Sequence, residues 1–229
     1  MCGRFTLTVD PNVIQLAFAL DSVPGAWRPR YNIAPTQPVL ALTNEGTRDA
    51  TLLQWGLVPS WAKDPSIGSR MINARAETLA EKPSFRAAFR RRRCVIFADG
   101  FYEWQKGPDG KKTPVYIRVH DGQPFAFAGL WEVWQGPGAE NWLRTCTIIT
   151  TRPNTFMARI HNRMPVILDR ARVEDWLTPE EVEPALLQEI LAPYAPAAFS
   201  AYPVSRAVNS PHNDDPSLIE PLAGQPGLL

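Results

Sequence analysis

The sequence predicts an α+β protein built around one mostly antiparallel, barrel-like sheet with peripheral helices. Short apolar, strand-like runs are numerous and are separated by turn residues, whereas helical patterns are few. The 23 prolines are spread along all 229 residues, so they mark turns and not a low-complexity linker. With 45% hydrophobic residues the chain can bury a full core. We therefore expect one domain over residues 1–222 and a frayed tail over residues 223–229.

The elements are expected in the following order. Residues 4–8 form a first strand, and a helix follows in which Asp10 is the cap and Pro11 the first residue. A loop rich in proline and aromatic residues continues to Pro35. Eight further strand-like runs cover residues 38–42, 51–57, 94–98, 102–105, 114–119, 124–130, 143–150 and 164–168. Helical patterns cover residues 83–93, 172–177 and 179–191, with a short turn at 154–159.

The charge is unevenly distributed, although the net charge is only +1. Residues 70–93 hold eight basic side chains against two acidic ones, whereas from Glu174 onward nine acidic side chains face only Arg206. A basic segment inside a nearly neutral protein suits a polyanion such as a nucleic acid. The four arginines at 90–93, taken alone, are equally typical of a solvated helix face.

The three cysteines, Cys2, Cys94 and Cys146, are an odd set without CxxC spacing. They indicate a reducing, cytoplasmic setting and no zinc site. No uninterrupted apolar stretch reaches about 18 residues, and Asp10-Pro11 interrupts the N-terminal region. We expect a protein that is neither secreted nor bound to a membrane.

Cys2 has the most distinctive chemistry in the chain. Removal of Met1, which is usual when a small side chain follows, would make Cys2 a 1,2-aminothiol. Its amine and thiol, with ordinary pKa values of about 8 and about 8.5, would both be partly available at neutral pH. Such a pair captures aldehydes, because the amine forms an imine and the thiol then closes a thiazolidine ring. The plainer alternative, a small buried cysteine beside a first strand, is the more common situation in proteins.

Three internal segments combine polar side chains with rigid or aromatic surroundings. Asn73 and Arg75 share a face if the chain is extended there, and an amide beside a guanidinium can orient a phosphorylated, hydroxylated substrate. Glu103 follows a buried-looking strand, so burial should raise its pKa toward the range useful for proton transfer, and Trp104 offers a stacking face. His161 precedes an apolar strand and is a candidate for proton transfer. Each motif also has a structural interpretation, as a helix cap, a strand end or a core histidine.

Taken together, the motifs resemble the SRAP family, which processes abasic sites in single-stranded DNA. The matching segments, in order, are MCGRF at 1–5, YNIAPT at 31–36, WGLVP at 55–59, NARAET at 73–78, RC at 93–94 leading into GFYEW at 100–104, and HNRMPV at 161–166. Each segment alone is weak evidence. Six in the same order make a specific match over most of the chain, and the resemblance implies a single SRAP-type domain.

The resemblance implies that Cys2, once Met1 is lost, attacks the ring-opened aldehyde of an abasic site and forms a covalent thiazolidine crosslink. Asn73 would orient the N-terminus and sugar, Glu103 would move protons, and His161 would help to open the sugar. The residues implied to contact DNA are Arg4, Trp61, Arg75, Arg86, Trp104 and Arg163. The family is also associated with autoproteolytic exposure of Cys2, which is a peptidase activity. Reversal of the DNA-protein crosslink by the protein would be a lyase-like activity. The implied protein is a cytoplasmic monomer without cofactor or metal, associated with the nucleoid when bound to DNA.

Two other classes remain open. An N-terminal nucleophile glutamine amidotransferase would also begin Met-Cys-Gly, but Arg4-Phe5 follows here and no glutamine pocket motif is found. A non-catalytic reader of DNA or modified bases would not need Cys2. The basic segment and eight tryptophans agree with single-stranded DNA as partner, since such proteins combine phosphate contacts with aromatic stacking.

Overall fold

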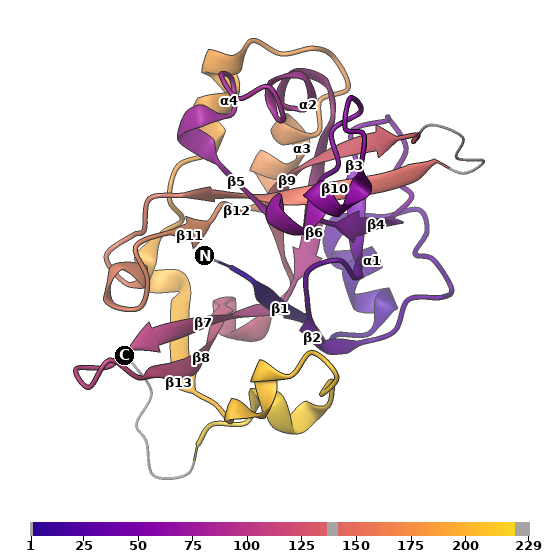
Figure 1. Ribbon diagram of the computed structural model, residues 1–229. Helices are drawn as coiled ribbons and strands as arrows, with labels where there is room; N and C mark the ends of the chain where they lie inside the picture. Colours follow the sequence, from indigo (N-terminus) through magenta and orange to yellow (C-terminus); the bar gives the residue numbers. More distant parts are fainter. Residues whose placement is uncertain (1, 137–141, 223–229) are drawn as a thin grey trace.

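Five strands close into a barrel in the computed structural model, which describes residues 2–136 and 142–222 (Figure 1). They are β3 (Pro38–Thr43), β4 (Thr51–Trp55), β6 (Arg93–Ala98), β9 (Phe125–Trp134) and β10 (Leu143–Thr151). Each strand pairs antiparallel with the next in the order β4, β3, β6, β9, β10, and a parallel pairing of β10 with β4 closes the ring. The predicted barrel-like, mostly antiparallel sheet is confirmed.

Three short strands extend the barrel at its edges. β5 (Asn73–Arg75) runs parallel to the end of β10, while β11 (Met164–Pro165) and β12 (Ile167–Leu168) pair antiparallel with β10 and β9. β9 is therefore shared between several partners, and Gly129 lies where it pairs with both β6 and β10. A Cβ atom at Gly129 would approach the Cys94 sulfur and the Thr147 carbonyl oxygen to 2.9 Å each, so a side chain does not fit there.

A second, antiparallel sheet lies against the barrel. Its order is β13 (Phe199–Pro203), β8 (Lys112–Val119), β7 (Gly100–Lys106), β1 (Arg4–Leu7) and β2 (Arg30–Ile33). The chain passes from the barrel into this sheet at Asp99, between β6 and β7. The buried Asp99 carboxylate accepts hydrogen bonds from the hydroxyl of Thr6 at 2.5 Å and from the backbone N–H and hydroxyl of Thr8 at 2.5 and 2.7 Å. These bonds fix the end of β1 at the junction of the two sheets.

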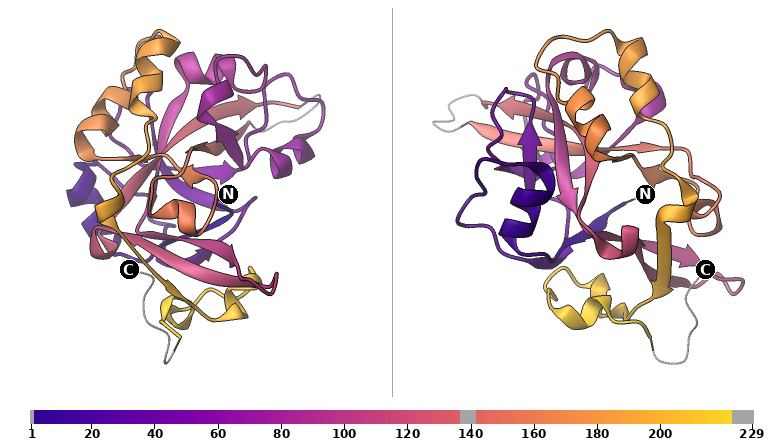
Figure 2. Two further views of the ribbon diagram at one scale, coloured as in Figure 1. Left: turned by 90° about the vertical axis from the view of Figure 1, so that its left-hand side faces the viewer. Right: turned by 180° about the vertical axis from the view of Figure 1, so that it is seen from behind.

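The helices lie outside the sheets, as predicted (Figure 2). The α-helices are α1 (Pro11–Phe18), α2 (Arg86–Arg91), α3 (Arg170–Trp176) and α4 (Pro184–Ile190). The 3-10 helices are η1 (Pro65–Arg70), η2 (Ala76–Thr78), η3 (His120–Gly122), η4 (Met157–Arg159), η5 (Pro196–Ala198), η6 (Arg206–Asn209) and η7 (Pro216–Ile219). Asp10 and Asp169 cap α1 and α3 by accepting backbone hydrogen bonds at 2.8 and 2.9 Å.

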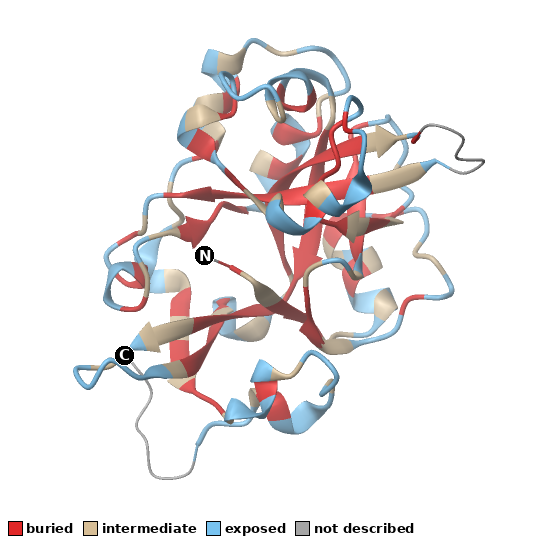
Figure 3. Ribbon diagram, viewed as in Figure 1, coloured by how far each residue is buried: buried red, intermediate tan, exposed pale blue. Residues whose placement is uncertain are grey.

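The core fills the barrel and continues between the barrel and the second sheet (Figure 3). Phe5 of β1 packs edge-on against Trp55 and Phe127, with ring centroids 5.2 and 5.7 Å apart. Burial of one such ring stabilises the fold by roughly 1.5–3 kcal/mol. The strand that carries the N-terminal residues is therefore anchored in the core.

Several details differ from the sequence-based expectations. β2, β5 and β13 are strands in addition to those expected, and the apolar run at 164–168 forms two short strands. The helices expected at 83–93 and 179–191 are shorter, as α2 and α4. The solvated face expected as one interpretation of residues 90–93 is wrong for Arg93, which is fully buried. The expected tail at 223–229 lies outside the described residues.

Candidate active site

Cys2 lies two residues before β1, and its side chain is fully buried. β1 carries it between the barrel and β7, because Arg4 pairs with Tyr102 and Phe5 with Phe101. Burial raises the pKa of the Cys2 thiol well above its ordinary value, and the charge of Glu103 raises it further. The thiol is therefore protonated at neutral pH in the chain that carries Met1; the partly ionised aminothiol expected after Met1 removal stays a prediction.

Asn73 contacts Cys2 directly. β5 pairs with β10 so that Asn73 lies opposite Ile148, and this register directs its amide toward the start of β1. The Asn73 Nδ2 group donates a hydrogen bond of 2.8 Å to the Cys2 carbonyl oxygen. Its Oδ1 atom is buried and accepts no hydrogen bond from the residues that the structure describes. An unsatisfied buried acceptor beside Cys2 is suited to receive a donor from a bound substrate or from an amine.

Glu103 is buried on β7, with 2% of its surface exposed. It shares a face of the strand with Phe101, two residues earlier, and this face is turned to the core. Burial raises the pKa of the Glu103 carboxyl, as the sequence predicts, and its charge acts on the Cys2 thiol. A carboxyl group with a raised pKa can both donate and accept a proton near neutral pH.

His161 lies on the segment between β10 and β11. Its backbone N–H donates to the carbonyl oxygen of Met157 at 2.8 Å, and the Gln105 amide on β7 holds the same segment through the carbonyl oxygen of Arg159 at 2.9 Å. The His161 Nδ1 atom accepts the backbone N–H of Arg163 at 3.1 Å, which leaves Nε2 as the protonated nitrogen of the neutral ring. Burial lowers the pKa of His161, so the neutral form predominates at pH 7.

These residues come from distant parts of the chain, and the two sheets bring their elements to one region (Figure 1). The start of β1 reaches β5 through Asn73 and lies beside β7 and Glu103. The segment holding His161 is tied to the same strand β7 by Gln105. Gln105 and its bond were missed by the sequence analysis, because nothing in the sequence relates residue 105 to residue 159.

The arginines predicted to contact DNA fall into two groups. Arg163 makes a two-pronged ion pair with Glu77 at 2.7 and 2.9 Å and also donates to the Thr150 carbonyl oxygen at 2.6 Å. Arg4 donates to the Asn32 side chain at 2.8 Å and to the carbonyl oxygens of Val208 and Asn209. By contrast, the side chains of Arg75 and Arg86 are exposed, and no ion pair is found for them in the described part of the chain.

The two tryptophans also differ. Trp61 has 58% of its surface exposed, so a face is available for stacking. Trp104 is partly buried and donates from Nε1 to the Asn209 side chain at 2.8 Å. A cavity of about 400 Å³ opens beside Asn73 and is lined by Asn73, Arg75, Thr78, Lys82 and Phe85. Lys82 was not among the predicted site residues, although it belongs to the basic segment.

Within residues 2–136 and 142–222, no group of three or more His, Cys, Asp or Glu side chains is arranged to hold a metal ion. No described helix combines the length and apolar character that crossing a membrane requires. Cys94 and Cys146 are buried, free thiols within the barrel strands.

Sequence and structure comparisons place this chain in a known class of protein. The family model "SOS response associated peptidase (SRAP)" matches residues 1–211. The chain is 49% identical to the abasic site processing protein YoqW of Bacillus subtilis, over 96% of this chain and 99% of that protein. It is 34% identical to the abasic site processing protein YedK of Escherichia coli, over 97% of this chain and 100% of that protein.

A solved structure of a Bacteroides thetaiotaomicron protein has the same fold, with a TM-score of 0.85 and 26% identity over 96% of this chain and 100% of the other. The chain belongs to the SRAP family. The resemblance of its six motifs to that family is thereby confirmed.

Proposed function

We propose that this protein processes abasic sites in single-stranded DNA by forming a covalent crosslink from Cys2, after Met1 has been removed. The observation that carries the proposal is the convergence of Asn73 and Glu103 on Cys2. The relatives are named abasic site processing proteins, and this supports the same substrate class here. An abasic site is suited to the chemistry, because its ring-opened sugar carries an aldehyde that intact DNA lacks.

The reaction joins two nucleophiles to one carbon. The α-amine of Cys2 attacks the aldehyde carbon and gives a carbinolamine, which loses one water to become an imine. The thiol sulfur then bonds to the same carbon, and the thiol proton ends on the ring nitrogen. The product is a thiazolidine, and the adduct equals protein plus DNA minus one water.

The chemistry of the pair sets the order of these steps. The thiol closes the ring by adding to an imine carbon, which exists only after the amine has condensed with the aldehyde. The amine reacts first, and the thiol follows once the imine has formed beside it. In this proposal Glu103 protonates the departing hydroxyl, then accepts the thiol proton and passes it to the ring nitrogen.

Asn73 and His161 have supporting roles in this proposal. The bond from Asn73 to the Cys2 carbonyl oxygen holds the first residue in position, and the Asn73 Oδ1 atom remains available to accept from the amine or the sugar. His161, neutral and protonated on Nε2, can donate to the ring oxygen of the closed sugar and favour the aldehyde form.

The DNA strand would be held mainly by exposed cations and an exposed ring. Arg75 and Arg86 are available for phosphates, and Trp61 is available for a base or sugar. Arg4 and Arg163 already make internal bonds, so they contribute with their remaining N–H groups or by exchanging a partner. The affinity for DNA should fall with salt and depend little on sequence.

Intact-mass analysis of the protein mixed with single-stranded DNA containing one abasic site tests the proposal. We expect an adduct with the wild type and with a Cys146→Ala control. We expect none with Cys2→Ala, nor with a chain in which a lysine inserted between Met1 and Cys2 blocks Met1 removal. The spectrum of the free protein establishes whether Met1 is absent.

The two alternative classes give different outcomes in the same experiment. Glutamine hydrolysis without an adduct would favour an amidotransferase. Reversible DNA binding that survives Cys2→Ala, again without an adduct, would favour a non-catalytic reader. An autopeptidase activity would appear as loss of Met1 from freshly refolded protein that contains no aminopeptidase, and Glu103→Gln would abolish that loss.

A further inference from the structure

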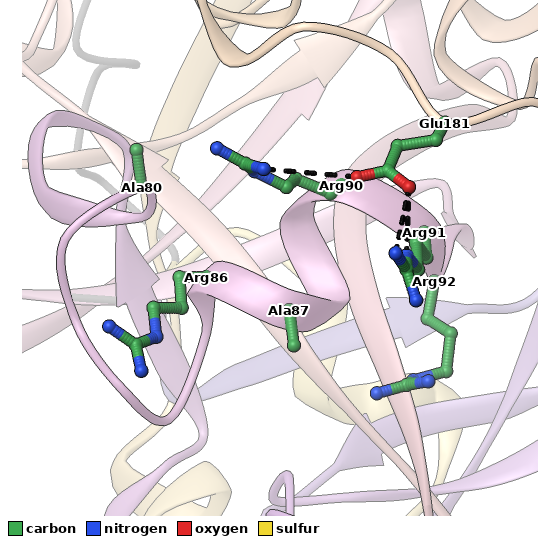
Figure 4. A pocket seen from close by; sticks show the side chains of 7 residues that line it. All are labelled: Ala80, Arg86, Ala87, Arg90, Arg91, Arg92 and Glu181. Carbon is green, nitrogen blue, oxygen red and sulfur yellow. Dashed lines mark hydrogen bonds and ion pairs between the residues drawn. The ribbon is translucent and has the colours of Figure 1, made fainter.

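A second basic cavity of about 540 Å³ lies along α2, outside the site around Cys2 (Figure 4). Its charged lining consists of Arg86, Arg90, Arg91, Arg92 and Glu181. Arg86 and Arg90 are four residues apart on α2 and both line the cavity; Figure 4 shows Arg90 beside Glu181 and Arg86 extending from the start of the helix. The cavity is thus an open groove with cationic walls, suited to an extended anion and not to an apolar ligand.

The acidic partner in this cavity is weakly held. Glu181 forms ion pairs with Arg91 at 2.9 Å and with Arg90 at 3.8 Å. About half or more of the Arg90 and Arg91 side chains and 45% of the Glu181 side chain are exposed. Exposed ion pairs of this kind are screened by water and salt and contribute little stability. A phosphate group could therefore replace the Glu181 carboxylate at small cost.

Arg92 is bound differently and is not part of this exchange. It donates to Glu132 at 2.7 Å, and the Glu132 side chain is only 7% exposed. The groove therefore contains three arginines available to a ligand: Arg86, Arg90 and Arg91. Arg86 has no ion-pair partner among the described residues, and Arg90 and Arg91 share Glu181.

The α2 groove and the candidate active site are joined by one segment. The cavity beside Asn73 is lined by Thr78, Lys82 and Phe85, and the α2 cavity takes its lining from Ala80 and from Arg86 onward. Backbone bonds from Lys82 to Thr78 and from Arg86 to Lys82, at 3.0 and 2.9 Å, make this segment a compact wall. β5, whose Asn73 bonds to Cys2, is followed along the chain by η2 and then by α2. Cations therefore follow one another away from Cys2, in the order Arg75, Lys82, Arg86 and Arg90.

We propose that the α2 groove is an extension of the DNA-binding surface, in which Arg86, Arg90 and Arg91 bind the phosphates of nucleotides distant from the abasic site and Glu181 competes with those phosphates. This inference rests on the proposed function for the substrate class. The ligand is a single DNA strand on one side of the abasic nucleotide. Glu181 lowers the affinity for long strands and has no effect on strands too short to reach α2.

The test measures reversible binding of unmodified single-stranded oligothymidylates, short and long, across a salt series. Arg90→Gln/Arg91→Gln removes both charges from the groove. The matched control, Arg28→Gln/Arg170→Gln, removes two charges from residues that do not line it. Since each phosphate contact contributes about 0.7 to the salt slope for a single strand, we expect the groove variant to lose about 1.4 from the slope on the long strand. The short strand and the control variant should show no such change.

Glu181→Gln gives the opposite test. It should tighten binding of the long strand severalfold and leave the short strand unaffected, whereas Glu174→Gln should change neither. Glu174 is a fair control because it also forms an exposed ion pair, with Arg48 at 2.9 Å, but lies outside the groove. Unchanged slopes and affinities in both groove variants would overturn the inference.

The readouts separate this inference from the proposed function. Crosslinking of a short abasic strand depends on Cys2 and not on the groove. If every groove variant formed the short-strand adduct and bound the long strand as wild type does, the inference about the α2 groove would be rejected and the crosslinking proposal would stand. Absence of any adduct with normal length-dependent binding would reject the crosslinking proposal and leave the groove intact.

Discussion

Replacement of Arg93 should be among the most destabilising single changes outside the site. The guanidinium is fully buried and has no acidic partner at hydrogen-bond distance in the described chain. Instead it donates to five carbonyl oxygens, at the end of α2 and in the segment after α3. They belong to Phe89, Arg90, Trp176, Thr178 and Glu180, at 3.4, 2.5, 2.8, 2.5 and 3.0 Å. Arg93→Met keeps most of the hydrocarbon stem and removes all of these bonds.

The size of the effect follows from which carbonyl groups can reach water. The bonds to Trp176 and Phe89 are enclosed, whereas the other three lie nearer the surface. A buried acceptor left unsatisfied costs about 1–3 kcal/mol, and an acceptor that gains water costs less. We therefore expect Arg93→Met to lower the free energy of unfolding by about 3–5 kcal/mol. For a chain of this length that corresponds to a fall in Tm of roughly 6–20 °C.

Thermal unfolding followed by calorimetry or circular dichroism measures this effect. The control is Arg91→Met, which removes only an exposed ion pair with Glu181 and should lower Tm by no more than about 4 °C. If Arg93→Met melted within a few degrees of Arg91→Met, the interpretation of Arg93 as the link between α2 and the segment after α3 would be wrong.

Three further changes have defined outcomes. Burial raises the pKa of Glu103, so the protonated carboxyl stabilises the fold fully below the ordinary pKa of 4.5, and this stability is lost as pH rises through the raised value. Glu103→Gln should therefore melt at a higher temperature than wild type at pH 8, and the difference should vanish near pH 4. Asn73→Ala should slow crosslinking roughly tenfold in single-turnover kinetics, since one bond to the Cys2 carbonyl is lost, while circular dichroism stays unchanged. Gly129→Ala should cost about 1–3 kcal/mol in denaturant unfolding because its Cβ has no space, whereas Gly25→Ala, with open space around it, should cost far less.

Much of the barrel could be predicted because its strands are apolar runs of strand length bounded by turn residues. Those runs identify β3, β6 and β10 to within one residue at each end, whereas β9 continues four residues beyond the expected run. β5 could not be found in this way, since three residues with two polar side chains carry no pattern, and it is held by pairing with β10. Its two outer residues are Asn73 and Arg75, so the strand hardest to predict supplies the direct contact to Cys2.

The candidate site was predictable by residue type and motif, but not by the state of each side chain. Glu103 could be expected to be buried with a raised pKa because aromatic residues flank it. The internal partners of Arg4 and Arg163 could not be expected, because they lie at Val208 and Glu77, far along the chain. The DNA contacts of both arginines remain predictions, and exposure favours Arg75 and Arg86 for that role.

The burial of Cys2 also constrains when the protein can be matured. β1 is complete only when it pairs with β7, whose residues are synthesised about a hundred positions later. At roughly 5–20 residues per second, the start of the chain stays undocked for about 5–20 s during translation. An aminopeptidase acting at the ribosome has this interval in which Cys2 is not yet enclosed. Under the proposed function, which requires loss of Met1, faster synthesis should shorten this interval and leave more of the chain unprocessed.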